Sequence, residues 1–123
     1  MPQDNVDLTR ALYQAYARKD RAAIETLIAA DFHFTSPLDN RLKRGAYFAR
    51  CWPNSETIVA FDFIHVLPDG DRVFVTYEAT GIAGNRFRNT EILTFAEGQV
   101  TNVEVYFGWN LPHPAKAGRW VAG

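Results

Sequence analysis

The pattern of hydrophobic and polar positions changes near residue 57 of the chain. Before it, apolar residues recur at spacings of three and four, which indicates amphipathic helices. Residues 4–18 predict a helix capped by Asp4 or Asn5, with one apolar face made of Leu8, Leu12, Ala15 and Tyr16. Asp20 can cap a second helix, whose apolar stripe is Ala23, Ile24, Leu27 and Ile28.

The middle of the chain contains shorter predicted elements. DFHFTSP, residues 31–37, predicts a short strand ended by Pro37. PLDNRLKRG, residues 37–45, predicts a loop because it combines Pro, Asp-Asn, Gly and three basic residues. AYFARCW, residues 46–52, predicts one or two helical turns stopped by Pro53.

From residue 57 the chain is rich in β-branched and aromatic residues, which predicts strands. Short turns separate four such segments, which are residues 57–67, 72–80, 85–95 and 99–109. They predict an antiparallel meander. Helices followed by a strongly bent sheet indicate an α+β fold, with the helices on the apolar face and a cone-shaped, aromatic-lined cavity between the layers.

Length and composition limit the class of protein. The 123 residues indicate one domain, residues 1–123, with a core of about 5–111 and an irregular tail 112–123. A net charge of -1, with both signs interleaved, argues against nucleic acid or an anionic membrane as a partner. No apolar run reaches the ~20 residues that span a bilayer. The single cysteine and the absence of a visible signal peptide favour a cytoplasmic protein.

Glu91 occupies an unexpected position in the predicted strand 85–95. Alternation places it on the more apolar face, together with Phe87, Asn89, Leu93 and Phe95. A carboxyl group in an apolar pocket has a raised pKa, which suits a general acid or base. The alternative is a structural role, in which Glu91 pairs with an Arg or Lys or bonds Tyr77 across the sheet.

Asp39 and His65 are the other candidate catalytic residues. Asp39 lies in SPLDNR at the expected mouth of the cavity, where it could act as a base, although a turn residue bonding its own backbone is the favoured interpretation. His65 is expected on the face of Phe61 and Phe63 and could supply a second base, although a lone histidine is more often structural.

Several polar and aromatic residues are candidates for ligand contacts, with plain core packing as the alternative for each aromatic. An aromatic lining suits a small, mostly apolar ligand with a few polar groups. The candidates are Tyr16, Ser36, Trp52, Tyr77, Asn89, Phe107 and Trp109. The three histidines lack metal-ligand spacing and no phosphate loop or dinucleotide fingerprint is present, so neither a metal nor a cofactor is expected.

The order of these features resembles a known family. "KD" before the second helix, AADFHFTSP, KRG opening a third helix and GQVTNVEVYFGWN resemble the SnoaL-like proteins of the nuclear-transport-factor-2-like superfamily, which includes ketosteroid isomerase. The resemblance covers residues 5–111. It implies a homodimer, and a mixed outer sheet face allows one, with Phe74, Thr76, Glu78, Thr90, Ile92 and Thr94.

The resemblance also assigns roles to particular positions. Ser36 falls where the steroid isomerases have their aspartate base, and Glu91 falls on the protonated acid that donates to their oxyanion. Phe107 falls on a pocket aromatic. Leu12 falls on the principal tyrosine, with Tyr13 and Tyr16 nearby. Because the base is lost, steroid isomerisation is not expected.

Two hypotheses follow for the function. The first is a small cofactor-free isomerase, cyclase or dehydratase acting by proton transfer on a hydrophobic cyclic or polyketide-like compound. The second is a non-catalytic module for ligand binding or dimeric assembly.

Overall fold

The computed structural model describes residues 4–122. Residues 1–3 and 123 of the predicted 1–123 domain lie outside the described residues. The helices are α1 (Asn5–Ala17), α2 (Arg21–Leu27), α3 (Arg44–Arg50) and a short 3₁₀ helix η1 (Trp52–Thr57). The strands are β1 (Ile28–Ser36), β2 (Asp39–Lys43), β3 (Ile58–Asp69), β4 (Arg72–Gly81), β5 (Arg86–Ala96) and β6 (Gln99–Leu111).

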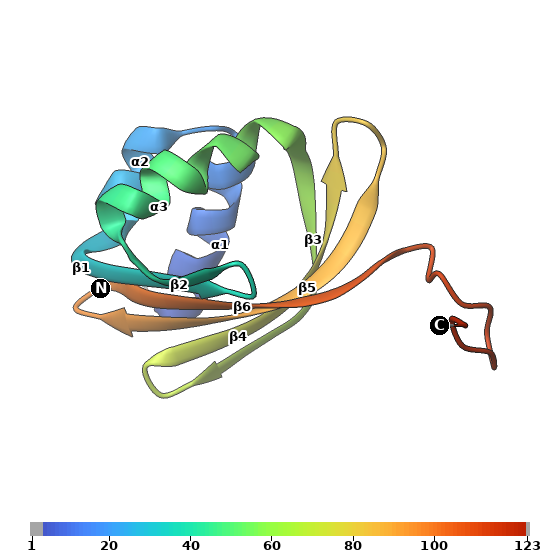
Figure 1. The fold of residues 1–123 in the computed structure, drawn as a ribbon. Helices are drawn as coiled ribbons and strands as arrows, with labels where there is room; N and C mark the ends of the chain where they lie inside the picture. The colour runs from blue at the N-terminus through green and yellow to red at the C-terminus, as the bar shows by residue number, and fades with distance from the viewer. Residues whose placement is uncertain (1–3, 123) are drawn as a thin grey trace.

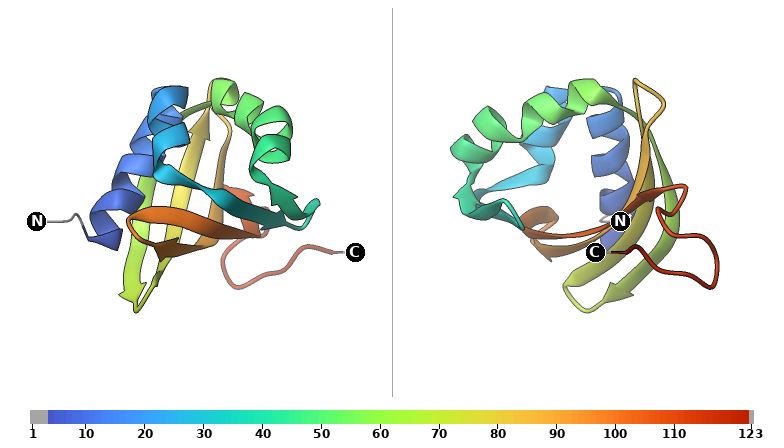
Figure 2. Two further views of the ribbon diagram at one scale, coloured as in Figure 1. Left: turned by 90° about the vertical axis from the view of Figure 1, so that its left-hand side faces the viewer. Right: turned by 45° about the vertical axis from the view of Figure 1, so that its right-hand side comes forward.

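The strands form one curved sheet of six, in the order β2-β1-β6-β5-β4-β3. All neighbours are antiparallel except β1 and β6, which are parallel. The helices lie within the curve of the sheet, as Figures 1 and 2 show. The predicted α+β class and curved sheet are confirmed, and the sheet is not closed. Residues 112–122 form no helix or strand and lead away from the sheet (Figure 1).

The prediction of a loop over residues 37–45 is wrong, because Asp39–Lys43 forms β2. A tight turn at Pro37-Leu38 returns the chain, so that Asp39 pairs with Ser36 in the β1–β2 ladder. β2 lies at the edge of the sheet, where polar side chains meet solvent on most sides. A polar edge strand lacks the alternation of apolar and polar residues that predicts a strand, so its residues resemble those of a loop.

The predicted N-terminal caps of the first two helices agree with the structure, but the predicted extent of the second helix does not. The Asp4 side chain accepts a hydrogen bond from the Asp7 amide, and Asp20 accepts one from the Ala23 amide. Ile28, expected on the second helix, instead begins β1 with an extended backbone. Pro53 does not end the helical region, since it lies in the first turn of η1, where its missing amide hydrogen is tolerated.

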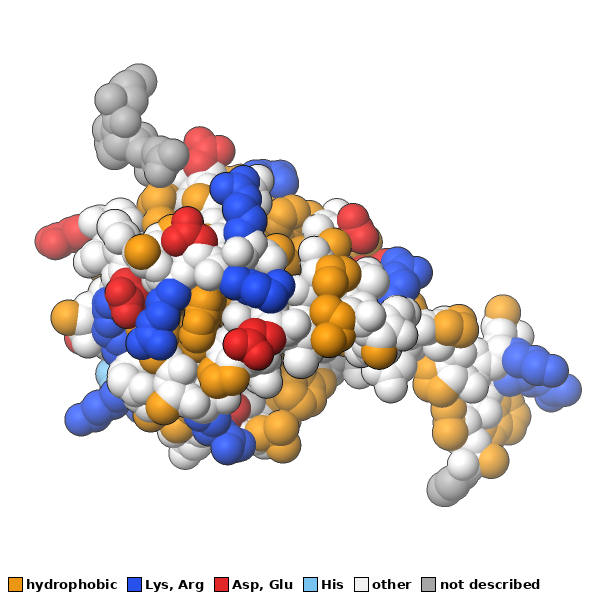
Figure 3. Space-filling view, turned by 90° about the horizontal axis from the view of Figure 1, so that it is seen from above, with side chains coloured by type: hydrophobic (Ala, Val, Ile, Leu, Met, Phe, Trp, Pro, Cys, Tyr) orange, Lys and Arg blue, Asp and Glu red, His pale blue; other side chains and the backbone are white. Residues whose placement is uncertain are grey.

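The inner face of the sheet supplies most of the core. Alternate residues of β4 are buried from Val73 to Gly81, and Leu93 and Phe95 of β5 are buried beside them. On the helical face of the molecule, acidic and basic side chains lie close to one another (Figure 3). In residues 4–122, no helix is both long and apolar enough to cross a membrane.

Bulges shift the alternation at two places near the cavity. One lies in β3 between Phe63 and His65. The other interrupts the β5–β6 ladder between Phe87 and Asn89, opposite Gly108 of β6. A Cβ atom on Gly108 would lie 2.2 Å from the carbonyl oxygen of Arg88, so the two backbones approach too closely for any side chain.

We therefore expect Gly108→Ala to destabilise the protein by about 1–3 kcal/mol, since an added methyl group must push the two backbones apart. Urea unfolding measures the change. Gly45→Ala in α3 is the control, because nothing lies within 4 Å of its Cβ position and alanine is favoured in helices by up to about 1 kcal/mol. Equal stabilities for the two variants would contradict the close approach.

Candidate functional site

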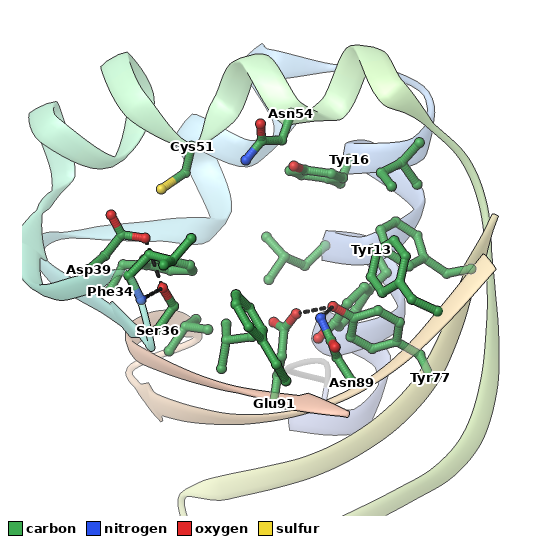
Figure 4. Close-up of a pocket in the computed structure, with 18 of the residues that line it drawn as sticks. Tyr13, Tyr16, Phe34, Ser36, Asp39, Cys51, Asn54, Tyr77, Asn89 and Glu91 are labelled. Carbon is green, nitrogen blue, oxygen red and sulfur yellow. Dashed lines mark hydrogen bonds between the residues drawn. The ribbon is translucent and has the colours of Figure 1, made fainter. Parts of the chain in front are cut away.

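A cavity of about 550 Å³ lies between the concave sheet and the helices. This volume suits a small-molecule ligand. Its lining includes ten aromatic residues, of which Tyr13, Tyr16, Phe34 and Tyr77 are labelled in Figure 4; the others are Phe32, Tyr47, Phe61, Phe87, Phe107 and Trp109. Three of the lining residues, Leu38, Phe107 and Trp109, are well exposed to solvent, so they mark the mouth of the cavity.

Glu91 projects from β5 into this cavity (Figure 4). The Tyr77 hydroxyl donates a hydrogen bond of 2.6 Å to its Oε2 atom. Burial raises the pKa of Glu91, and the hydroxyls of Tyr77 and Tyr13 offset part of that rise. The Glu91 side chain is half-buried, and because it lines the cavity, its accessible surface faces the cavity interior. The predicted inward orientation of Glu91 is confirmed.

A chain of hydrogen bonds fixes the Tyr77 hydroxyl. The Asn89 side-chain amide donates to the Tyr77 oxygen at 3.4 Å, and the Gly108 amide donates to the Asn89 Oδ1 atom at 3.2 Å. Tyr77 therefore accepts from Asn89 and directs its only hydrogen at Glu91. The close approach at Gly108 thus stabilises the arrangement around the carboxyl group.

Tyr13 of α1 lies at the site but was not among the predicted site residues, although the resemblance placed it near the position of the isomerases' principal tyrosine. Its ring is buried, and its hydroxyl has no hydrogen-bond partner among residues 4–122. Tyr13 faces the cavity and lies near Glu91. The pKa of Tyr13 lies well above the usual tyrosine value, mainly because of burial and secondly because of the Glu91 charge. Buried hydroxyls are usually hydrogen-bonded, so the unpaired Tyr13 hydroxyl is available to bond a polar group of a ligand. The spacing of Thr9, Tyr13 and Tyr16 is the signal that could have revealed it.

Asp39 lies near the mouth and is fully engaged with side chains. It is ion-paired with Arg50, and the Ser36 hydroxyl donates to its Oδ2 atom at 2.8 Å. Hydrogen bonding from Arg50 is the main cause of its lowered pKa, so the carboxylate is ionised and a weak base. The favoured interpretation, a turn residue bonding its own backbone, is wrong, because these partners are side chains.

Two of the predicted site residues lie outside the cavity lining. His65 is exposed, because the bulge after Phe63 changes which side chains of β3 face inward. Trp52 does not line the cavity either. Its ring packs nearly perpendicular to the Tyr16 ring, with the centroids 5.5 Å apart, and so supports Tyr16, which does line the cavity.

The remaining predicted ligand-binding residues all line the cavity, namely Tyr16, Ser36, Tyr77, Asn89, Phe107 and Trp109. Trp109 is held at the mouth by the Arg88 guanidinium, 5.4 Å from the ring centroid. The Tyr77 side chain faces inward because β4 and β5 pair without a register shift from Arg72 to Thr80. Their contacts with a ligand remain predictions.

Charge is distributed unevenly around the cavity. Glu91 and Asp39 line it, whereas no Lys, Arg or His of residues 4–122 does. Cys51 also lines it, and burial raises the pKa of its thiol to about 11, so the thiol is neutral and unreactive at neutral pH. Within the described part of the chain, no group of three or more His, Cys, Asp or Glu side chains could hold a metal ion.

Comparison with known proteins places the fold. A family profile described as a SnoaL-like domain matches residues 9–103. No curated protein sequence matches the chain. Among solved structures, an LEH-like epoxide hydrolase of M. tuberculosis is similar, with a TM-score of 0.71 and 16% identity over 84% of this chain and 81% of that one.

Two further structures show the same likeness. A putative polyketide cyclase from Sinorhizobium meliloti has a TM-score of 0.68 and 19% identity, over 80% of this chain and 93% of that one. A protein with a ketosteroid isomerase-like fold from Catenulispora acidiphila, in complex with trimethylamine, has a TM-score of 0.68 and 18% identity, over 82% and 85%. At these identities the likeness concerns the fold.

Removing the Glu91 charge should change how stability depends on pH. Its folded pKa lies above its unfolded value, so its contribution to stability falls as the pH rises from the unfolded to the folded pKa, and is constant beyond. Each tenfold change in the ionisation constant corresponds to about 1.4 kcal/mol. We therefore expect Glu91→Gln to gain stability relative to the natural protein as the pH rises.

Urea unfolding at a series of pH values from about 4 to 8 measures this difference. Glu56→Gln is the matched control, because Glu56 is exposed on η1 and does not line the cavity. A difference for Glu91→Gln that is independent of pH would show that the buried carboxyl is not destabilised in its charged form.

Proposed function

The chain belongs to the SnoaL-like family, and on that premise we propose that it is a small cofactor-free enzyme acting by acid/base proton transfer. Its substrate would be a hydrophobic cyclic or polyketide-like compound, and its reaction an isomerisation, cyclisation or dehydration. One observation carries the proposal: the Glu91 carboxyl group, whose pKa is raised by burial, faces an aromatic-lined cavity large enough for a ligand.

Glu91 has the environment of a general acid. Its raised pKa favours the protonated form, which can give a proton to a polar group of the substrate. The free hydroxyl of Tyr13 can donate a hydrogen bond to the same group. Asp39 is held ionised at the mouth, so the two carboxyl groups have pKa values displaced in opposite directions, and Asp39 would act on a substrate through its charge more than as a base.

The structural neighbours support a small-molecule site in this fold. They include an epoxide hydrolase, a putative polyketide cyclase and a protein in complex with trimethylamine. Fold alone does not determine the reaction, since one fold hosts many chemistries. The neighbours therefore support a small-molecule site, and the proposed substrate class is based on the residues that line the cavity.

A non-catalytic binding module is the second candidate, favoured by the shortage of free bases. Arg50 and Ser36 both engage Asp39, and His65 lies outside the cavity. Ser36 stands where the resemblance expects a base. In this role the same cavity would bind an apolar ligand at Glu91 without turnover.

Replacing Glu91 by Gln tests catalysis directly. A general acid or base contributes roughly 10²–10⁴-fold to rate, so Glu91→Gln should lower kcat by that factor once a compound screen finds a substrate. Circular dichroism checks that the variant is folded, and Glu56→Gln is the control. Undiminished kcat in Glu91→Gln would rule out this role. Ligand binding with no turnover by the natural protein would favour the binding module.

We also propose that the protein is a cytoplasmic homodimer that associates through the outer sheet face. On that face Phe74 and Ile92 are cross-strand partners and half-buried, next to a hydrogen bond of 2.8 Å between the hydroxyls of Thr76 and Thr90. A mixed, β-branched surface of this kind suits contact with a second copy.

Light scattering at micromolar concentration should give the mass of a dimer. Ile92→Lys should shift it to a monomer, because a buried lysine without a partner is strongly unfavourable. Ile82→Lys, in the exposed turn between β4 and β5, is the control and should remain dimeric. A monomeric natural protein would refute the proposal.

A further inference from the structure

The cavity wall contains one carboxyl group that no cation of residues 4–122 balances. Of its two carboxyl groups, Asp39 is neutralised by Arg50, which does not itself line the cavity. Within residues 4–122 Glu91 forms no ion pair. It accepts a hydrogen bond from the Tyr77 hydroxyl, and the Tyr13 hydroxyl, which has no hydrogen-bond partner there, lies near it. A ligand anion would therefore meet no compensating charge, whereas a ligand cation would meet a carboxyl group that lacks a counter-ion.

Aromatic rings surround the same end of the cavity. Tyr13, Phe61 and Tyr77 contact one another pairwise, with ring centroids 5.1, 5.4 and 5.2 Å apart. Tyr16 and Tyr47 face the same space from α1 and α3. Aromatic rings attract ammonium groups through their electron-rich faces, and sites for quaternary amines are built from such rings.

Among the titratable groups of residues 4–122 that line the cavity, Glu91 is the carboxyl group whose pKa burial raises. From the helices, burial raises the pKa of Tyr13, Tyr16 and Tyr47 above the usual tyrosine value, and from β4 it does the same for Tyr77. The pKa of the Cys51 thiol is about 11, and Asp39 is already ionised. None of the three histidines lines the cavity.

We infer that the polar group recognised beside Glu91 is a basic nitrogen, so that the ligands are hydrophobic compounds carrying a protonated tertiary or a quaternary amine. The inference deepens the proposed function and rests on it only in taking this cavity as the ligand site. A cation beside Glu91 stabilises the carboxylate that burial disfavours, so binding displaces the carboxyl proton into solvent. The aromatic rings then surround the alkyl groups on the nitrogen.

A carbonyl oxygen is the competing ligand group. It would accept hydrogen bonds from protonated Glu91 and from the Tyr13 hydroxyl. The two chemistries predict opposite effects of pH. A cation prefers ionised Glu91, so its affinity rises with pH until Glu91 is ionised in the free protein. A carbonyl group prefers protonated Glu91, so its affinity falls as the pH rises through the same pKa.

Calorimetry of the full-length protein with matched probes distinguishes these cases. The probes are benzyltrimethylammonium, its uncharged isostere neopentylbenzene and phenyl tert-butyl ketone. We expect benzyltrimethylammonium to bind most tightly, with Kd falling roughly tenfold per pH unit below the Glu91 pKa and levelling off above it. Below the Glu91 pKa, titration in buffers of different ionisation enthalpy should show the release of about one proton per ligand bound, falling to zero above it.

The Glu91→Gln variant should weaken benzyltrimethylammonium binding at least about tenfold and make it independent of pH. It should leave the ketone's affinity within a few-fold, because the glutamine amide still donates a hydrogen bond. Glu56→Gln should behave as the natural protein does. The sign of the pH dependence and the proton release are measured on the natural protein, so the test survives if Glu91→Gln does not fold.

Other outcomes identify which proposal fails. Tighter binding of the ketone, with affinity falling as the pH rises, overturns the amine inference and leaves Glu91 as a proton donor in the proposed function. Equal binding of the cation and its uncharged isostere also overturns the inference. If the binding of both benzyltrimethylammonium and the ketone is unaffected by pH and by Glu91→Gln, ligands do not interact with Glu91, which overturns the inference and the proposed function together.

Discussion

The hydrogen bond from Tyr77 to Glu91 is the interaction on which the site depends. It joins β4 and β5 inside the cavity, where Tyr77 pairs with Asn89 and Val75 pairs with Glu91 in the ladder. The two bonded side chains are thus diagonal neighbours on one face. A register slip by one residue would turn one of them outward, so the pairing of these strands determines whether the cavity contains a carboxyl group. The bond between Gly108 and Asn89 extends the same constraint to β6.

The aromatic residues around the cavity contact one another, some edge to face and others at tilted angles. Tyr13 meets Phe63 at 90°, and Tyr16 meets Trp52 at 89°. In such contacts each ring packs against a neighbouring ring in the cavity wall and does not reach across the cavity to the opposite wall. An open interior is unfavourable compared with a packed one, so a wall of mutually supported rings is needed to keep it from collapsing. The exposed rings at the mouth continue this lining outward.

Strand alternation was enough to predict the orientation of Glu91, because β4 and β5 pair without a register shift around it. The same reasoning failed for His65, since a bulge adds a residue to β3 and reverses the alternation beyond it. It failed for β2 because an edge strand can be polar on both faces. Tyr13 was missed because the buried face of α1 is wider than a single stripe, and only packing against β3 and β4 determines which residues face inward.

The two carboxyl groups of the cavity show why one fold can accept different ligands. Asp39 interacts with Arg50 outside the lining, so its charge is fixed whether or not a ligand is present. Glu91 has no such partner, and its ionisation depends on what lies beside it. The apolar wall contributes affinity without chemical detail, because burial of apolar surface is not directional. Chemical selectivity is therefore concentrated at Glu91 and its tyrosine neighbours, and a change there would alter the ligand while leaving the fold intact.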